Sequence, residues 1–331
     1  MKEKATLNIL YQSDSNMQYY MGVSIVSLFE HNKDAFINVY IIDIEIESCF
    51  LDVLESYIKE RNGSVRIIDG NELAARPEVK EFPCYRGMRK NSRSYLKLFW
   101  SLAIHDDIDR LIYIDCDTAV VGKLSKLNSF DLDGKTIGMV YDSLITDEIV
   151  NVGLDKNEPY YNSGVILFDV KRWRASNACE RIAEHAKTHS YGTVDQDLIN
   201  IEFKNEIKCL PLEYNFQSIH YLTKPGLYVK EFNRSNYYSL REIEEASQNK
   251  KIVHYLKFNG ENSWDKGNLH PCKKLFESYL RISPWKNLKK TKHKSKLIYF
   301  IEKILYIVLP RACFIKIFHI AHRGKINNSN K

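Results

Sequence analysis

The sequence of 331 residues lacks several features that would assign it to a specialised class of protein. Its seven cysteines are dispersed without close pairs, which argues against a disulfide scaffold or a zinc site and favours reduced thiols. It has no internal repeat, no low-complexity segment and no linker rich in Gly, Pro or Ser in its body. The first residues, MKEKATLNILYQSD, contain no long apolar run, so we expect no cleaved secretory signal and a cytosolic location.

Charge of one sign is concentrated at one end of the chain. The net charge is +6, but residues 284–331 contain twelve Lys or Arg and one acid, Glu302. This segment therefore carries +11, and residues 1–283 carry −5. A mildly acidic body argues against nucleic-acid binding, and the basic segment is typical of an appended binding element.

The body alternates short β-rich runs with helical patterns, which predicts an α/β domain. Strands joined by helices imply a largely parallel sheet. The predicted strands are residues 7–12, 37–43, 64–69 and 110–115, and the helices between them are residues 21–32, 49–63 (ended by Gly63) and 92–104. The mixture continues through residues 136–208, and the pattern of 217–270 is irregular, as expected where loops build a substrate site.

The tail is expected to form amphipathic helices. A basic run at 286–296 precedes the apolar segments 297–310 and 311–325, which are too short and too interrupted to cross a membrane. One helical face would carry Leu297, Ile301, Ile304, Leu305 and Val308. Basic flanks beside such a face are typical of a helix lying on an anionic membrane surface. The alternatives are that the tail packs onto the body or forms an oligomer interface.

An Asp-x-Asp pair directly follows the predicted strand 110–115. The pattern itself is not specific, because it occurs four times: Asp107/Asp109, Asp115/Asp117, Asp131/Asp133 and Asp195/Asp197. Only Asp115 and Asp117 follow a buried strand, and ligands of open α/β sheets bind beyond the carboxyl ends of strands. Two carboxylates there can hold Mg²⁺ or Mn²⁺, although they can also cap a turn. Cys116, between them, is expected to be a small buried spacer and not a catalytic thiol.

Two enzyme classes place such a pair at the end of a strand. In haloacid-dehalogenase phosphatases the pattern is Asp-x-Asp-x-Thr, normally on the first strand. Here Thr118 follows the second aspartate directly and several strands precede it. The spacing therefore favours the second class, nucleotide-sugar transferases of the GT-A fold, in which the pair holds a metal and the donor diphosphate.

The order of several sequence blocks resembles glycosyltransferase family 8. The blocks are LNILYQSDSN, RLIYIDCDTAVV, YYNSGVILFDVKRW, VDQDLIN, YNF and IVHY, and they span about residues 6 to 265. The resemblance implies a GT-A fold with a Rossmann-like, mainly parallel sheet. It also implies a retaining galactosyl- or glucosyltransferase that uses a UDP-sugar in the synthesis of bacterial surface glycans.

The resemblance also implies roles for individual residues. Asp14 and Asn16 match positions that meet the uridine, although Asp14 also fits a turn at the end of a strand. Asp115 and Asp117 match the pair that holds Mn²⁺ or Mg²⁺, with Asp115 also touching the donor. His254 matches the third metal ligand, although a lone histidine is more often a packing or capping residue.

On the sugar side, the resemblance implies donor contacts for Asp142 and Asn162, with Gly164 allowing close approach of the backbone. Asp195 and Gln196 match the pair beside the anomeric carbon, which makes Gln196, Asp195, Asp142 and Asn162 the predicted catalytic group. Asp197 is expected to be a structural residue at a helix start.

Two positions depart from the family pattern. Lys97, a predicted donor-binding residue, stands where the family has Arg, so the charge is kept without the bidentate fork. The segment after His254 reads YLKFNGENSW and lacks the family's Lys-Pro pair before Trp264. That lysine touches the diphosphate in the family, and Lys257 or Lys266 would have to replace it here.

The sequence thus predicts a transferase domain at 1–283 and a basic amphipathic membrane-association segment at 284–331. The expected partners are a UDP-hexose, a glycan or glycolipid acceptor of lipopolysaccharide, lipooligosaccharide or capsule type, and the inner face of the cell membrane. The alternatives are a non-catalytic nucleotide-sugar-binding scaffold and, less favoured, the phosphatase.

Overall fold

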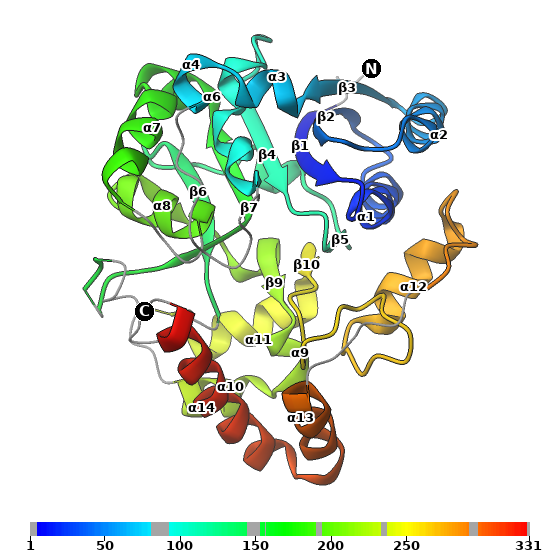
Figure 1. The fold of residues 1–331 in the computed structure, drawn as a ribbon, viewed down its shortest axis with the longest axis vertical. Coiled ribbons are helices and arrows are strands. Elements are labelled where there is room, and N and C mark those ends of the chain that lie inside the picture. Colours follow the sequence, from blue (N-terminus) through cyan, green and yellow to red (C-terminus); the bar gives the residue numbers. More distant parts are fainter. Residues whose placement is uncertain are drawn as a thin grey trace.

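The computed structural model describes residues 5–80, 93–143, 153–155, 157–189, 194–232, 237–290 and 297–329. Its main sheet has seven strands in the order β3-β2-β1-β4-β7-β6-β8 (Figure 1). These strands are β1 (Thr6–Asp14), β2 (Phe36–Ile44), β3 (Gly63–Asp69), β4 (Arg110–Ile114), β6 (Ile137–Tyr141), β7 (Tyr161–Asp169) and β8 (Ile207–Cys209). The predicted strands 7–12, 37–43, 64–69 and 110–115 correspond to β1, β2, β3 and β4.

The sheet is mostly parallel, as the sequence predicts. Strands β3, β2, β1 and β4 all run parallel, and β6 and β8 are also parallel to each other. Only β7 runs antiparallel to both of its neighbours, β4 and β6. The fold is the mixed α/β arrangement of a GT-A domain.

Helices cover both faces of the main sheet. One face packs on α1 (Gln18–His31) and α2 (Ser48–Lys59), and the other on α3 (Gly70–Ala74), the 3-10 helix η1 (Ser94–Leu102), α6 (Val170–Ala175), α7 (Ala178–Thr188) and α8 (Val194–Glu202). Alternating side chains of the central strand explain this: Ile9 and Tyr11 point to the first face and Leu10 to the second. Short helices α4 (Pro77–Lys80) and α5 (Ser125–Asn128) lie in the connections.

Three predictions of local structure need correction. The helix predicted for 49–63 ends at Lys59, and Gly63 instead begins β3. The helix predicted for 92–104 is the 3-10 helix η1, and Ser92 lies outside the described residues. The segment 217–270 is not mainly irregular, since it contains α9 (Ile219–Leu222), α10 (Pro225–Phe232) and α11 (Leu240–Asn249). Ser239 and Glu242 form a capping box at the start of α11, a sequence signal that the prediction missed.

A second, three-stranded sheet lies beyond the carboxyl ends of the main strands (Figure 1). Its order is β5 (Thr118–Val120), β10 (Ile252–His254) and β9 (Phe216–Gln217), with the 3-10 helix η3 (Leu212–Asn215) leading into β9. The chain leaves β4 at Ile114 and enters β5 at Thr118, so residues 115–117 form the junction between the two sheets. Pairing of His254 with Thr118 brings β10 to that junction.

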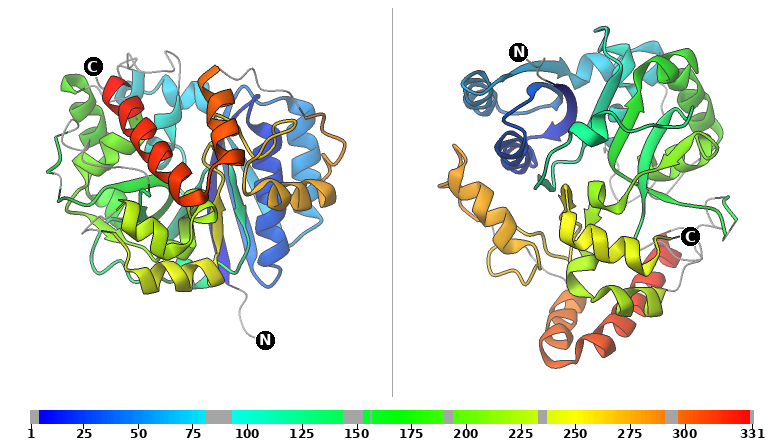
Figure 2. Two further views of the ribbon diagram at one scale, coloured as in Figure 1. Left: turned by 90° about the horizontal axis from the view of Figure 1, so that it is seen from below. Right: turned by 180° about the vertical axis from the view of Figure 1, so that it is seen from behind.

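The C-terminal part forms α12 (Lys273–Ile282), α13 (Leu297–Val308) and α14 (Arg311–Ser329). Helices α13 and α14 lie together at one end of the molecule, with α14 beside α10 (Figures 1 and 2). Phe314 and Ile315 of α14 are buried in the core of the body. Residues 291–296 of the predicted basic run lie outside the described residues. Among the described residues, none of the helices has the length and apolar character needed to span a bilayer.

Candidate active site

A cavity of about 980 Å³ opens between the two sheets, at the carboxyl ends of β1 and β4. All of the predicted donor-binding and metal-binding residues line it, and so do three of the four predicted catalytic residues. The fourth, Asp142, is buried directly behind Asn162 and Gln196. The fold therefore gathers residues that are spread between positions 14 and 254 of the chain into one site.

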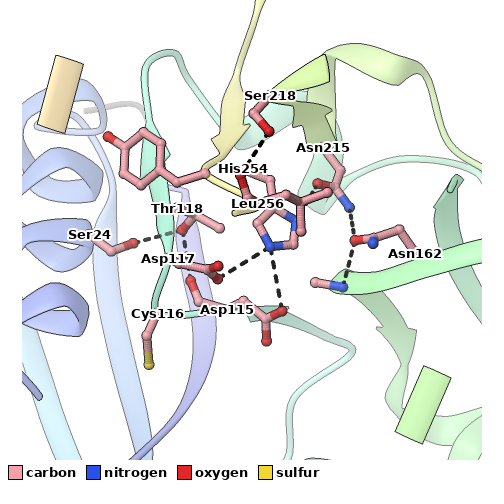
Figure 3. A network of polar contacts seen from close by, with 12 residues as sticks. Ser24, Asp115, Cys116, Asp117, Thr118, Asn162, Asn215, Ser218, His254 and Leu256 are labelled. Atoms are coloured by element: carbon pink, nitrogen blue, oxygen red, sulfur yellow. Dashed lines mark hydrogen bonds and ion pairs between the residues drawn. The ribbon is translucent and has the colours of Figure 1, made fainter. Parts of the chain in front are cut away.

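Asp115, Asp117 and His254 form a compact group at the junction of the sheets. His254 Nε2 lies 3.2 Å from Asp117 Oδ1 and 3.8 Å from Asp115 Oδ2 (Figure 3). The candidate ligand atoms of all three residues lie within 4.8 Å of one another. Among the described residues, no other Asp-x-Asp pair takes part in a group of this kind. Two carboxylates and an imidazole are a donor set that suits a divalent cation such as Mn²⁺.

The charges in this group support each other. Burial by itself raises the pKa of Asp117, but the facing His254 outweighs it and holds that pKa below its usual value. Burial likewise lowers the pKa of His254, but Asp117 and then Asp115 raise it above the usual value. The pair therefore keeps a negative carboxylate at the junction at neutral pH.

Lys97 is a buried cation that lies between Asp115 of the group just described and Asp195. Its Nζ lies 2.7 Å from Asp195 Oδ2 and 3.6 Å from Asp115 Oδ1, and it donates a hydrogen bond of 3.1 Å to the carbonyl of Ser163. Burial lowers the pKa of Lys97, but the two carboxylates outweigh that effect and raise it. The departure from Arg thus keeps a charged residue in contact with both acidic positions.

Around the predicted catalytic residues, five polar residues hold one another in place through hydrogen bonds. Asn162 Nδ2 donates to Asp142 Oδ2 at 3.0 Å and to Gln196 Oε1 at 3.2 Å. Gln196 Oε1 also accepts from the backbone N–H of Ser163 at 3.0 Å, and Gln196 Nε2 donates to Asp142 at 3.2 Å. The Ser163 hydroxyl donates to Asp195 Oδ2 at 2.9 Å. These bonds fix the orientation of the amide and carboxyl groups that face the cavity.

Asp14 lines the cavity and also shapes the turn after β1. Its Oδ1 accepts from the backbone N–H of Met17 at 2.9 Å, and its Oδ2 accepts from Asn16 Nδ2 at 3.3 Å. Both of the readings that the sequence leaves open, a strand-end turn and a cavity residue, are therefore compatible with its position. Asp197, expected to be structural, is buried in the first turn of α8 and accepts from the Tyr160 hydroxyl.

Several residues of the site were not identified from the sequence. Asn215 is fully buried, and its Oδ1 lies 3.1 Å from His254 Nδ1. Tyr20 and Trp264 stack at 3.9 Å between ring centroids, and both line the cavity. The YNF block contains Asn215, but nothing local in the sequence shows which side chain it would meet.

The structure separates two alternatives that the sequence left open. Lys257 lines the cavity and Lys266 does not. Cys116 is buried and its thiol donates to the carbonyl of Gln12 at 3.0 Å, while burial raises its pKa. A buried thiol with a raised pKa fits the expected spacer and not a nucleophile.

Comparison with known proteins identifies the family. The model of the glycosyl transferase family 8 matches residues 8–266. The chain belongs to this family. It is therefore a glycosyltransferase, which removes the phosphatase alternative.

Its relatives agree with this assignment. The lipopolysaccharide 1,2-glucosyltransferase of Escherichia coli (strain K12) is 29% identical over 288 residues, covering 85% of this chain and 79% of the relative. The similarity to this relative thus extends along most of the chain, beyond the residues of the site.

Solved structures share the fold. The galactosyltransferase LgtC in complex with donor and acceptor sugar analogues matches with a TM-score of 0.65 and 21% identity, over 84% of this chain and 96% of that one. The apo structure of the bifunctional glycosyltransferase WbbM has a TM-score of 0.70 and 18% identity, over 87% of this chain but only 51% of that one.

Proposed function

We propose that this glycosyltransferase transfers a glucose or galactose, with retention of the anomeric configuration, from a UDP-sugar to a bacterial surface-glycan acceptor, and that it needs Mn²⁺ or Mg²⁺. The observation that carries the proposal is the Asp115, Asp117 and His254 group beside the Lys97 and Asp195 pair in one cavity. The relatives' names support the reaction class: one is a glucosyltransferase acting on lipopolysaccharide and another is a galactosyltransferase.

The donor set fits a hard divalent cation, since it offers carboxylate oxygens and one imidazole nitrogen within 4.8 Å of one another. When bound, such a cation would act as a Lewis acid that neutralises the charge of the leaving diphosphate. Asp115, Asp117 and His254 would hold it, and Asp14 and Asn16 would meet the uridine at the end of β1. Lys97 would keep the carboxylates of Asp115 and Asp195 in place.

The sugar becomes oxocarbenium-like as its bond to the phosphate breaks, so negative and dipolar groups beside it stabilise the transition state. Asp142, Asp195 and Gln196 supply such groups, and Asn162 holds two of them. Gln196 is a weak nucleophile because its side chain is an amide. We therefore favour attack of the acceptor from the same face, with the departing phosphate oxygen taking the acceptor proton.

The tail would hold the enzyme at the membrane face where glycolipid acceptors are found. Helix α13 exposes six large apolar side chains: Leu297, Phe300, Ile301, Ile304, Ile307 and Val308. Its Leu305 packs against the body instead, so the expected apolar face is divided between body and solvent. An exposed apolar face within a segment of charge +11 fits the surface of an anionic membrane.

The reaction is tested by UDP release from UDP-glucose and from UDP-galactose, with Mn²⁺ or with EDTA. We expect slow hydrolysis that needs the metal and falls at least about 100-fold in Asp117→Ala, because that change removes a proposed metal ligand. Asp107→Ala, an exposed aspartate of another Asp-x-Asp pair, should keep full activity. Tight UDP binding without turnover of either donor would instead support the scaffold.

A further inference from the structure

His254 can bind a cation only through a ring nitrogen that carries no proton. The nitrogen that faces both carboxylates is Nε2, at 3.2 Å from Asp117 and 3.8 Å from Asp115. The neutral ring must therefore carry its proton on Nδ1. His254 is only 2% exposed, so hydrogen bonds to bulk water do not determine its tautomer. A hydrogen bond with a neighbouring protein group must do so.

A chain of hydrogen bonds starts from a donor whose direction is known (Figure 3). The backbone N–H of Gly164 donates to Asn162 Oδ1 at 3.0 Å, so this oxygen is an acceptor. Asn215 Nδ2 donates to the same oxygen at 2.8 Å. The other end of the Asn215 amide, Oδ1, therefore faces His254 Nδ1 at 3.1 Å. An amide oxygen can only accept, so Nδ1 must donate.

From this geometry we propose that Asn215 is a positioning residue that holds His254 in the Nδ1–H tautomer and so presents Nε2 to the cation. The inference rests on the proposed function, because it takes Asp115, Asp117 and His254 as the metal group. Asn162 extends the chain to Asp142, through the bond of 3.0 Å from its Nδ2. The residues expected to meet the sugar and the residues expected to hold the metal thus belong to one hydrogen-bonded unit.

Gly164 sets the position of the same ring by a separate constraint. A Cβ atom on Gly164 would lie 2.2 Å from His254 Cε1 and 2.6 Å from Nδ1. Such separations are far below van der Waals contact, so only glycine leaves room for the imidazole here. Gly164 therefore contributes twice: its N–H orients Asn162, and its missing side chain admits the ring of His254.

The test measures Mn²⁺ affinity of the purified full chain without substrate, by titration calorimetry and by the electron paramagnetic resonance signal of free Mn²⁺. We expect Asn215→Leu to weaken Mn²⁺ binding by about 10- to 100-fold, the range typical of lost partners of metal-binding histidines. The matched control is Asn32→Leu. Asn32 is also buried and also donates one bond, to Leu28, and accepts one, from Leu124, far from the site. Its Mn²⁺ affinity should equal that of the wild type.

Asn215→Asp separates the loss of the hydrogen-bond acceptor for His254 from a general loss of packing. Its carboxylate still accepts from Nδ1–H but cannot donate to Asn162. We expect its Mn²⁺ affinity not to fall by more than about threefold. If Asn215→Leu does not fold, Asn215→Ala, which also removes the acceptor, takes its place with the same expected loss. Unchanged binding in Asn215→Leu, an equal loss in Asn215→Asp, or an equal loss in Asn32→Leu would overturn the inference while leaving the metal site intact. A wild-type protein that binds no Mn²⁺ would overturn the metal-dependent function and this inference with it.

Discussion

Three Lys or Arg side chains among the described residues line the cavity, and they differ in what they contact. Lys97 is buried against Asp115 and Asp195, and Arg93 donates to Asn71. Lys257 is exposed and follows His254 by three positions. Under the proposed function Lys257 would be the side chain that meets the phosphates of the donor, because Lys97 is already engaged by two carboxylates.

We expect Lys257→Ala to weaken UDP binding about tenfold in the presence of Mn²⁺, because one charge-assisted hydrogen bond to a phosphate is lost, worth ~1.4 kcal/mol. Titration calorimetry with UDP measures the effect. Lys266→Ala is the matched control, since Lys266 is also exposed but lies outside the cavity lining, and its UDP affinity should not change. Equal losses in the two variants would show that general charge, and not this position, is responsible.

At the scale of elements, helices α13 and α14 of the tail pack against the loop that follows His254. Phe258 packs against Tyr306 and Phe314, and Lys303 forms an ion pair with Glu261. Gly260 has a φ of +72°, and a Cβ there would lie 2.5 Å from the ring of Tyr299. Removing the whole tail would therefore uncover buried residues of the body as well as remove the exposed face of α13.

Point substitutions on α13 test membrane binding without that disruption. We expect the double variant Ile304→Asp and Ile307→Asp to lose binding to vesicles containing anionic lipid by about 100-fold or more. Each exposed isoleucine that enters the interface contributes ~1.5 kcal/mol or more, and the added charges are repelled by the lipid. Co-sedimentation with vesicles measures the bound fraction.

Val53→Asp is the control for this measurement, because Val53 is another exposed apolar residue, on α2, with no part in α13. It should bind vesicles as the wild type does. Full vesicle binding by the α13 double variant would show that this helix face does not hold the protein on the membrane.

At the scale of the whole molecule, a buried histidine links stability to pH. His220 is buried among aromatic rings, 4.5 Å from that of Tyr228, and its Nε2 lies 2.9 Å from the Tyr237 hydroxyl. Burial lowers its pKa from 6.5 to about 3. Because the folded pKa lies below the unfolded one, the stability from a neutral His220 is complete above pH ~6.5 and is lost as the pH falls toward 3.

We expect the free energy of unfolding to fall by ~1.4 kcal/mol per pH unit from this group below pH ~6, or ~2 kcal/mol by pH 5. Urea denaturation at pH 7.5 and pH 5 measures the change. His220→Gln should lower stability at pH 7.5 but reduce the difference between the two pH values by that ~2 kcal/mol. An equal difference in variant and wild type would show that His220 does not stay neutral in the folded protein.

The local pattern of the sequence determined the family, the α/β class and the first four strands of the main sheet. Alternating and continuous apolar runs depend only on neighbouring residues, which is why β1, β2, β3 and β4 were predicted close to their true bounds. The same pattern marked Asp115 and Asp117 as the pair that follows a buried strand. It failed where helix signals were weak or unrecognised, as at α11, whose capping box was missed.

Only the tertiary structure decided which distant residues meet. His254 reaches Asp117 because β10 pairs with β5, and Asn215 reaches His254 because η3 leads into the neighbouring strand β9. No periodicity in the chain records such contacts, since they follow from sheet pairing and from the space that Gly164 leaves. The choice of Lys257 over Lys266 and the docking of α14 through Phe314 have the same origin: packing brings some residues of a segment to the body and leaves others in solvent.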